Sequence, residues 1–163
     1  MNADIQNGGA DSFVLLQVGN RRFALPAGIV SELAPPVRLH TFPQTTPLVS
    51  GVIVRRGHVV PVYDVGSVLL GRSASVHRFY LIARRDFANR SEPSAIPVSG
   101  ECELATAEMQ APGEGRPPYI SGTLTVNGEP IEVLNLNALV SQEGTSAGSR
   151  TAAGERIHEG ARP

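Results

Sequence analysis

The chain has 163 residues with a hydrophobic content of 41%, enough for one compact domain with its own core but not for two independent domains. Its formal net charge of −1 excludes a general nucleic-acid binder, and its single cysteine, Cys102, excludes an intrachain disulfide. Residues 1–12 lack the basic and apolar segments of a signal peptide, and no apolar run approaches the about 20 residues of a membrane-spanning helix, so we expect a cytoplasmic protein without membrane insertion.

The N-terminal part predicts a disordered start followed by a β-hairpin. Residues 1–12 are rich in Asn, Gly, Asp and Ala, which predicts disorder. Residues 13–18 (FVLLQV) and 23–26 (FALP) are expected strands joined by a turn. Residues 28–33 (GIVSEL) fit either a bent strand or one helical turn.

A second hairpin with a basic tip is expected at residues 51–65 (GVIVRRGHVVPVYDV). Its two apolar runs are short and β-branched, which favours strands over a helix. Gly57 can adopt a positive φ, so Arg55, Arg56 and His58 are expected at an exposed turn. From these residues alone, the turn is either a solvated tip or a partner-binding site. Residues 65–70 (VGSVLL) then predict a short turn of helix.

The middle of the chain carries weaker patterns. Residues 79–83 (FYLIA) predict a strand, the polar residues 84–94 a loop, and residues 95–98 (AIPV) a short apolar segment. Residues 100–109 (GECELATAEM) have an ambiguous period, for which we predict a strand followed by a bend.

The strongest hairpin pattern of the chain comes near its end. Residues 119–126 (YISGTLTV) and 130–134 (PIEVL) flank Asn127-Gly128, the preferred pair of a type I′ turn. Residues 134–140 (LNLNALV) predict a strand end that runs into a short helix. Residues 141–163 are rich in Gly, Ser, Ala and Glu, which predicts a disordered tail.

These short strands, separated by Gly and Pro turns, predict an all-β barrel or sandwich. The segments 51–62 and 122–131 share one pattern of strand, tight turn and strand. This similarity suggests two related β-lobes.

No motif for catalysis, metal binding or phosphate binding is present. The histidines are not at ligand spacing, and no CxxC, GxSxG or glycine-rich phosphate loop occurs. Asp64 follows a predicted strand, where it is expected to cap the next turn. Cys102 is expected to be a buried inert thiol, with a Cys102-dependent enzyme as a remote alternative. We therefore predict no catalytic residues, no metal and no cofactor.

The stretch 51–65 resembles the conserved motif of the CheW-like domain family: Gly-apolar-x-Asn-apolar-Arg-Gly, then x-apolar-apolar-Pro-apolar-x-Asp-Leu. Residues 13–26 are similar to the opening hairpin of that family, and residues 29–33 (IVSEL) to its Val-x-Glu-Ile segment. Residues 119–140 are similar to its closing hairpin with the ending Leu-Asp-Leu-x-x-Leu. The resemblance covers about residues 13–140, which we take as one CheW-like domain.

The resemblance implies an all-β fold of two SH3-like five-stranded β-barrel lobes that share one apolar core. It also implies a non-enzymatic adaptor that couples a methyl-accepting chemoreceptor to a CheA-type histidine kinase in chemotaxis or related motility signalling. In the family, the cytoplasmic tip of the receptor docks between the lobes and the regulatory domain of the kinase docks on the flank. Carried over by position, the partner-binding residues are Val30, Glu32, Gly51, Arg56 and Gly57. Arg56 takes the place of the family arginine whose loss impairs coupling.

The chain departs from the family pattern at several positions. Val54 stands where the family has Asn, Asn135 and Ser99 where it has Asp, and Arg55 where it has an apolar residue. Pro97 removes a backbone donor from an expected strand. The alternative is therefore a divergent CheW-like or β-barrel binding module with a different protein or ligand partner.

Overall fold

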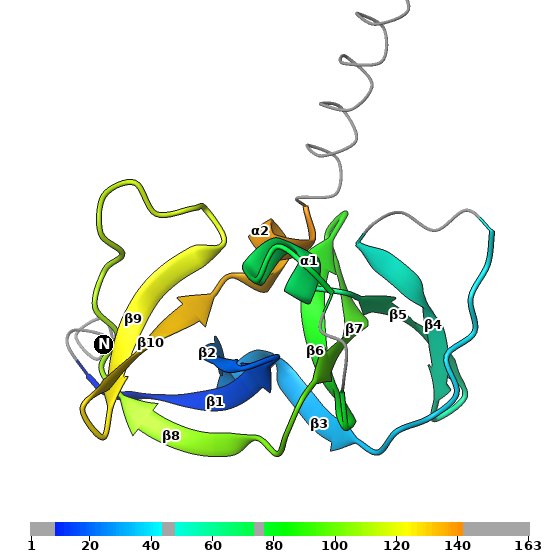
Figure 1. Cartoon of the computed structure of the whole chain (residues 1–163), viewed down its shortest axis with the longest axis horizontal. Coiled ribbons are helices and arrows are strands. Elements are labelled where there is room, and N and C mark those ends of the chain that lie inside the picture. The colour runs from blue at the N-terminus through cyan, green and yellow to red at the C-terminus, as the bar shows by residue number, and fades with distance from the viewer. Residues whose placement is uncertain (1–8, 44–47, 74–76, 142–163) are drawn as a thin grey trace, which may run out of the picture.

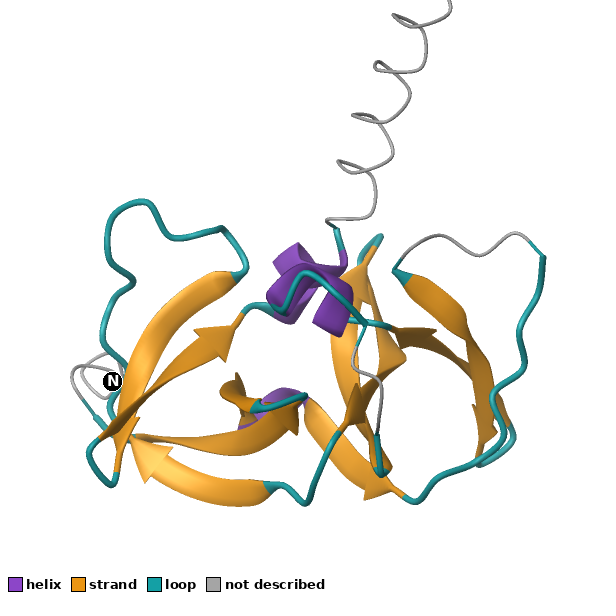
Figure 2. Ribbon diagram, in the orientation of Figure 1, coloured by secondary structure: helices purple, strands orange, loops and turns teal. Residues whose placement is uncertain are grey.

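The computed structural model describes residues 9–43, 48–73 and 77–141 and arranges ten strands in two five-stranded sheets, each forming one lobe (Figures 1 and 2). In spatial order the first lobe contains β8 (Glu103–Ala107), β1 (Asp11–Val18), β2 (Arg21–Pro26), β10 (Glu129–Leu134) and β9 (Ile120–Val126). The second lobe contains β3 (Val30–Ala34), β6 (Phe79–Phe87), β7 (Arg90–Val98), β5 (His58–Tyr63) and β4 (Val49–Arg55). The helical elements are the 3-10 helix η2 (Ala27–Ile29), α1 (Gly66–Leu69) and α2 (Leu136–Val140). Of the segments 1–12 and 141–163, for which disorder is predicted, residues 1–8 and 142–163 lie outside the described residues. Asp11 and Ser12 instead begin β1, where they pair with Ala107 and Thr106 of β8.

Each sheet is closed into a barrel by one isolated bridge between its two edges. In the second lobe, His40, which follows β3, pairs with Val52 of β4. In the first lobe, Gln110, which follows β8, pairs with Thr123 of β9. In both bridges a buried glycine directly precedes the residue on the sheet edge, Gly51 before Val52 and Gly122 before Thr123. A glycine is needed there because no side chain fits between the two backbones. The predicted all-β fold of two five-stranded lobes is confirmed.

The two lobes repeat one order of elements. The run β3-β4-β5-α1-β6-β7 corresponds to β8-β9-β10-α2 completed by β1-β2. The hairpin from the N-terminus thus completes the lobe that the C-terminal strands build, and β2 lies parallel to β10 as β7 lies parallel to β5. The similarity predicted between segments 51–62 and 122–131 is confirmed as the hairpins β4-β5 and β9-β10.

One apolar core runs through both lobes. Its buried side chains include Leu16 and Phe23 of the first lobe, Leu81 and Ile96 of the second, and Leu139 of α2. Figure 1 shows α1 and α2 together at the junction between the lobes. A smaller separate cluster fills each barrel. The shared core makes the two lobes one packing unit, as predicted.

The loop predicted for residues 84–94 is wrong, because these residues complete a long hairpin. The ladder between β6 and β7 runs from the pair Phe79–Val98 to the pair Phe87–Arg90. Its turn is Ala88-Asn89, with φ values of 52° and 64°. Polar residues continue the strands there because pairing between neighbouring strands outweighs the weak local preference. Ala88 carries no turn preference that the sequence could have shown.

Pro97 lies within β7 without breaking it. Alternate residues of a strand face the same neighbour, so Pro93 and Pro97 point their nitrogens to the side on which Ala95 pairs with β5. The missing donors therefore affect the pairing with β5, which is limited to Val62–Ala95, and leave the pairing with β6 intact.

Candidate partner-binding site

The basic turn is a two-residue hairpin tip, which we call the arginine tip (Arg55, Arg56, Gly57 and His58). Arg55 pairs with His58 at the end of the ladder, and the turn residues Arg56 and Gly57 have φ values of 53° and 79°. These are the backbone angles of a type I′ turn, which favours Asn-Gly. An arginine in the left-handed region costs about 1 kcal/mol. The turn conformation therefore does not explain an arginine at position 56. We expect the role of Arg56 to lie in its guanidinium side chain.

Glu32 of β3 binds both arginines of the tip. Arg55 donates to its two carboxylate oxygens from Nε at 3.0 Å and from Nη2 at 2.9 Å. Arg56 makes the same pair of contacts at 3.3 Å each. The side chains of Glu32 and Arg55 are 21% and 25% exposed, whereas that of Arg56 is 72% exposed. Glu32 and Arg55 thus form the better-sheltered pair.

The electrostatics of this cluster follow from the same hydrogen bonds. Those from Arg55, and secondly from Arg56, lower the pKa of the Glu32 carboxyl from 4.5 to about 2. The hydrogen bond to Glu32 in turn raises the pKa of Arg55. Glu32 is therefore ionised at neutral pH. The pair also ties β3 to β4, the two edge strands of the second lobe.

Beside the tip lies a hollow of about 260 Å³ at one end of the second barrel. Val60 and Ile82 form its buried apolar floor, and Pro93 lines its wall. Glu32 and the arginines of the tip line it as well. The hollow can accept an apolar side chain from a partner whose polar groups meet the charged side chains.

The structure brings together some of the five predicted site residues and separates others. Glu32, Arg56 and Gly57 meet at the arginine tip. Val30 begins β3 after η2 and packs against the shared core. Gly51 is buried in β4, where a Cβ would lie 2.4 Å from the carbonyl oxygen of His40. Gly51 therefore has a structural role in barrel closure.

Other residues at the hollow were not predicted. The sequence predicts Arg55 only as a turn residue, although its position beside Arg56 is a signal for a shared role. Ile82 and Pro93 come from β6 and β7, far from the tip in sequence. No local pattern could have placed them beside Glu32.

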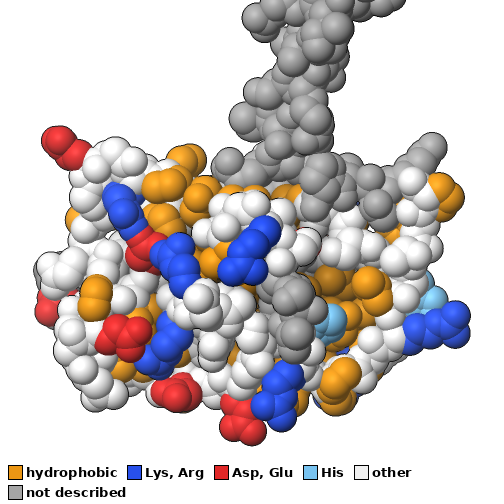
Figure 3. All heavy atoms as spheres, in the orientation of Figure 1, with side chains coloured by type: hydrophobic (Ala, Val, Ile, Leu, Met, Phe, Trp, Pro, Cys, Tyr) orange, Lys and Arg blue, Asp and Glu red, His pale blue; other side chains and the backbone are white. Residues whose placement is uncertain are grey.

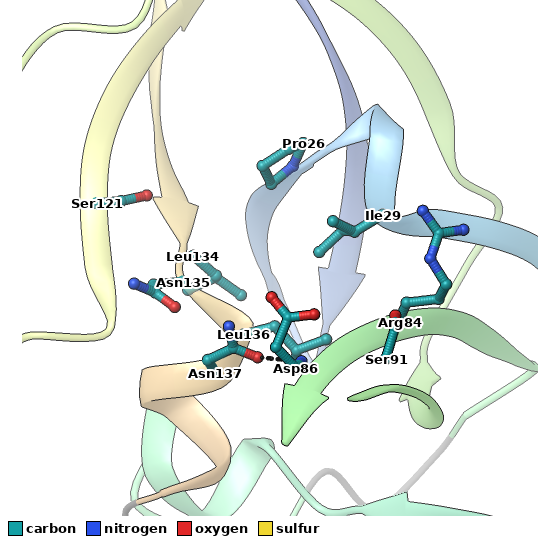
Figure 4. A pocket seen from close by; sticks show the side chains of 10 residues that line it. All are labelled: Pro26, Ile29, Arg84, Asp86, Ser91, Ser121, Leu134, Asn135, Leu136 and Asn137. Atoms are coloured by element: carbon teal, nitrogen blue, oxygen red, sulfur yellow. Dashed lines mark hydrogen bonds between the residues drawn. The ribbon is translucent and has the colours of Figure 1, made fainter. Parts of the chain in front are cut away.

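A second concave surface, of about 320 Å³, lies between the lobes (Figure 4). The side chains of Pro26 and Ile29 approach it from one side and those of Asn135 and Asn137 from the other. The amide oxygen of Asn137 accepts a hydrogen bond from the Asp86 backbone N–H at 2.9 Å, which links α2 to β6. The pocket mixes amide, carboxyl and apolar groups, so it can bind a partner by both hydrogen bonds and apolar contact.

Asn135 stands where the family pattern has Asp, and its side chain caps α2. It is the N-cap residue of α2, and its side chain accepts a hydrogen bond from the backbone N–H of Ala138 at 3.1 Å. Asn and Asp are nearly equal as N-caps. This departure therefore leaves the local structure intact.

The face of the first lobe in Figure 3 carries interspersed arginine and acidic side chains. Arg22 contacts Glu129 at 2.8 Å, and Arg21 contacts Glu132 at 3.2 Å. Arg116 also pairs with Glu132. Arg22 also contacts Glu103 at 3.6 Å, so three arginines are matched by three glutamates and this cluster offers no excess charge for a partner.

An exposed apolar pair occupies the outer side of the β4-β5 hairpin. Val54 and Val59 face each other across the strands and are 53% and 64% exposed. Val54 is the position at which the family motif has Asn. This surface is therefore more apolar than the family pattern predicts.

Cys102 and Asp64 are the remaining candidates for chemistry, and the surroundings of both favour structural roles. Burial raises the pKa of the half-buried Cys102 thiol to about 11, so the nucleophilic thiolate is scarce at neutral pH. The prediction that Asp64 caps the next turn with its side chain is wrong: its carboxylate binds the hydroxyl of Ser73, and α1 begins at Gly66 after the N-cap residue Val65 without a side-chain cap. Within residues 9–43, 48–73 and 77–141, no three His, Cys, Asp or Glu residues are placed to hold a metal ion. No helix in the described part of the chain is long and apolar enough to cross a membrane.

Comparisons with known proteins identify one family. The family model described as "CheW-like domain" matches residues 12–144. The solved structure of the scaffolding protein TtCheW from Thermoanaerobacter tengcongensis is similar with a TM-score of 0.68 and 16% sequence identity, over 80% of this chain and 87% of that chain. At this identity the similarity shows the fold alone. No curated protein matches the chain.

Proposed function

The chain belongs to the CheW-like domain family, and from this premise we propose that it is a non-enzymatic adaptor. It couples a methyl-accepting chemoreceptor to a CheA-type histidine kinase in chemotaxis or a related motility system. It acts in the cytoplasm, where the receptor tip and the kinase meet. It requires no cofactor, because its function is to hold two partners in a fixed geometry.

The observation that carries this proposal is a pair of concave surfaces on one rigid body. The shared core joins both lobes, so a partner bound at one surface is held in a set orientation to a partner bound at the other. One surface is the pocket between the lobes and the other is the hollow beside the arginine tip. An adaptor needs separate surfaces on a body that does not deform.

We assign the receptor tip to the groove between the lobes and the kinase regulatory domain to the flank. Of the five predicted partner-binding residues, Glu32, Arg56 and Gly57 lie where a partner can touch them. Val30 and Gly51 support the site from β3 and β4, through packing and barrel closure respectively. Substitutions at Val30 or Gly51 would thus disturb coupling through the scaffold.

A second candidate function is favoured by the exposed pair Val54 and Val59. An apolar pair in place of the family Asn changes what this hairpin can bind. A divergent CheW-like module with another protein partner would use this surface. The two candidates differ in whether a kinase regulatory domain and a receptor fragment both bind.

The test is calorimetric titration of the full chain with the regulatory domain of a CheA-type kinase and, separately, with a helical-hairpin fragment of a chemoreceptor, both from the same organism. The adaptor predicts saturable binding to both, with a Kd in the micromolar range, about −8 kcal/mol. It also predicts a ternary complex in size-exclusion chromatography. If the folded chain fails to bind one or both proteins, the adaptor function is refuted and the divergent module remains.

Two variants make the test specific. Arg56→Asn removes the guanidinium and retains a residue that tolerates the left-handed turn. Arg90→Asn is the matched control, because Arg90 is also 72% exposed and pairs with one carboxylate, Glu92, at 3.2 Å. We expect Arg56→Asn to weaken binding to one partner and Arg90→Asn to have no effect. Equal effects of the two variants would show that loss of any surface arginine suffices.

A further inference from the structure

The arginine tip holds two guanidinium groups against one carboxylate. Arg55 and Arg56 both bind Glu32, which leaves one positive charge in excess. His58 also lies at the tip and lines the same hollow. The family has an apolar residue at position 55, so the excess exists because of a residue particular to this chain.

The two arginines do not share Glu32 equally. The contacts from Arg55, at 2.9 and 3.0 Å, are close to the usual length of charge-assisted hydrogen bonds, whereas both contacts from Arg56 are 3.3 Å. Arg55 is also the more sheltered of the two, with 25% exposure against 72%. Solvent competes most with the exposed ion pair, so Arg56 gains less from Glu32 than Arg55 does.

We propose that Arg55 is the structural partner of Glu32, and that Arg56 is therefore available to bind a carboxylate of the docking protein. The site formed by the arginine tip and its hollow takes an acidic side chain that neighbours an aliphatic one. The acidic group pairs with Arg56 and the aliphatic group enters the hollow over Val60 and Ile82. This inference rests on the proposed function only for the identity of the partner, the kinase regulatory domain that docks on the flank.

The chemistry of the site supports an acidic partner in particular. The excess charge is positive, and a planar guanidinium at an exposed turn can bind a carboxylate through two parallel hydrogen bonds. A basic partner would be repelled by Arg56 and would find Glu32 already occupied by Arg55. An entirely apolar partner would bury the Arg56 charge without compensation.

The division of roles can be tested without any partner. Carbon-detected NMR titration of the Glu32 carboxyl in the wild type, in Arg55→Leu and in Arg56→Asn measures how much each arginine lowers its pKa. We expect the larger rise in pKa from Arg55→Leu. Arg55→Met, which keeps a long side chain for packing, provides a second variant if Arg55→Leu is unstable. A larger rise from Arg56→Asn would overturn the proposal.

The partner chemistry is tested by titration with the regulatory domain of the CheA-type kinase. Arg56→Asn should weaken binding about 2- to 5-fold, the range of one exposed charge pair. Arg55→Leu should also weaken it, although Arg56 is intact, because Glu32 then recaptures Arg56. The double variant Arg55→Leu/Glu32→Gln should restore binding, since no carboxylate remains to hold Arg56. If the double variant binds no better than Arg55→Leu alone, recapture by Glu32 is refuted.

The carboxylate on the partner is found by changing each exposed glutamate of the kinase regulatory domain to glutamine. One such change should weaken wild-type binding and have no further effect on Arg56→Asn, because both changes remove the same pair. If every change is additive with Arg56→Asn, Arg56 does not bind a carboxylate there. If the wild type does not bind the kinase regulatory domain at all, the proposed partner is refuted, while the Glu32 titration still decides the roles of the two arginines.

Discussion

Replacing Gly51 by alanine should open the second barrel, and the structure allows the effect to be worked out. A Cβ at this position would lie 2.4 Å from the carbonyl oxygen of His40 and 3.2 Å from the Cδ1 of Leu39. Because the nearest atom belongs to the backbone, β4 must move away from the segment that holds His40. That movement breaks the bridge in which His40 and Val52 exchange hydrogen bonds of 2.8 and 2.9 Å.

The expected loss of stability combines two terms. Each backbone hydrogen bond contributes about 0.5–1.5 kcal/mol. The φ of +157° at Gly51 lies outside the common range for alanine and adds about 1–2 kcal/mol. Gly51→Ala should therefore lower the free energy of unfolding by about 2–5 kcal/mol, which for a domain of this size lowers the Tm by about 8–20 °C.

The assay is urea unfolding followed by circular dichroism, with two comparison variants. Gly122→Ala should be destabilised as well, because a Cβ there would lie 2.5 Å from the carbonyl oxygen of Gln110 in the equivalent bridge of the first lobe. Gly28→Ala should be neutral, because a Cβ there meets nothing within 4 Å. If Gly51→Ala unfolds at the same urea concentration as Gly28→Ala, the barrel-closure argument is wrong. If it is stable but loses a partner, Gly51 acts through direct contact.

Three further predictions concern the tip and α2. Arg56→Asn should be more stable than Arg56→Ala by about 0.5–1 kcal/mol, because Asn tolerates the positive φ of 53°; equal urea midpoints would contradict this. The folded-state pKa of Glu32 lies below its value of 4.5 in the unfolded chain, so its ion pairs stabilise the fold above about pH 4.5 and are lost as the pH falls toward 2. The wild type should therefore be more stable than Glu32→Gln by about 1 kcal/mol at pH 6, after solvent screening, and this difference should vanish near pH 2. A difference that does not change with pH would show that the ion pairs of Glu32 do not stabilise the fold. Asn135→Ala should cost about 1 kcal/mol in urea unfolding by loss of the α2 cap while Asn135→Asp is neutral, and equal losses would exclude a capping role.

Much of the fold was predictable because its signals are local. The β-branched runs around Arg56-Gly57 and Asn127-Gly128 predict hairpins, and both turns adopt the positive φ values that such pairs favour. The repeated order of strand, turn and strand was enough to suggest two lobes. The family motif then connected the segments, because its residues recur in register along most of the chain.

The hairpin β6-β7 could not be predicted from its own residues. Polar side chains and Ala88-Asn89 suggest a loop, and only pairing between β6 and β7, with β3 beside β6, makes those residues strands. Local propensity fails here because the free energy of a strand depends on its neighbours.

The sequence alone determined which residues could carry function: two arginines at a tight turn and a glutamate in the segment 29–33. Only the tertiary structure decided their roles. Folding brings β3 beside β4, so that Glu32 binds Arg55 more closely than Arg56, and it places Ile82 and Pro93 at the same hollow. Gly51 likewise acquires its role from the backbone of His40. Such contacts depend on barrel closure, a long-range event that no local pattern of residues encodes.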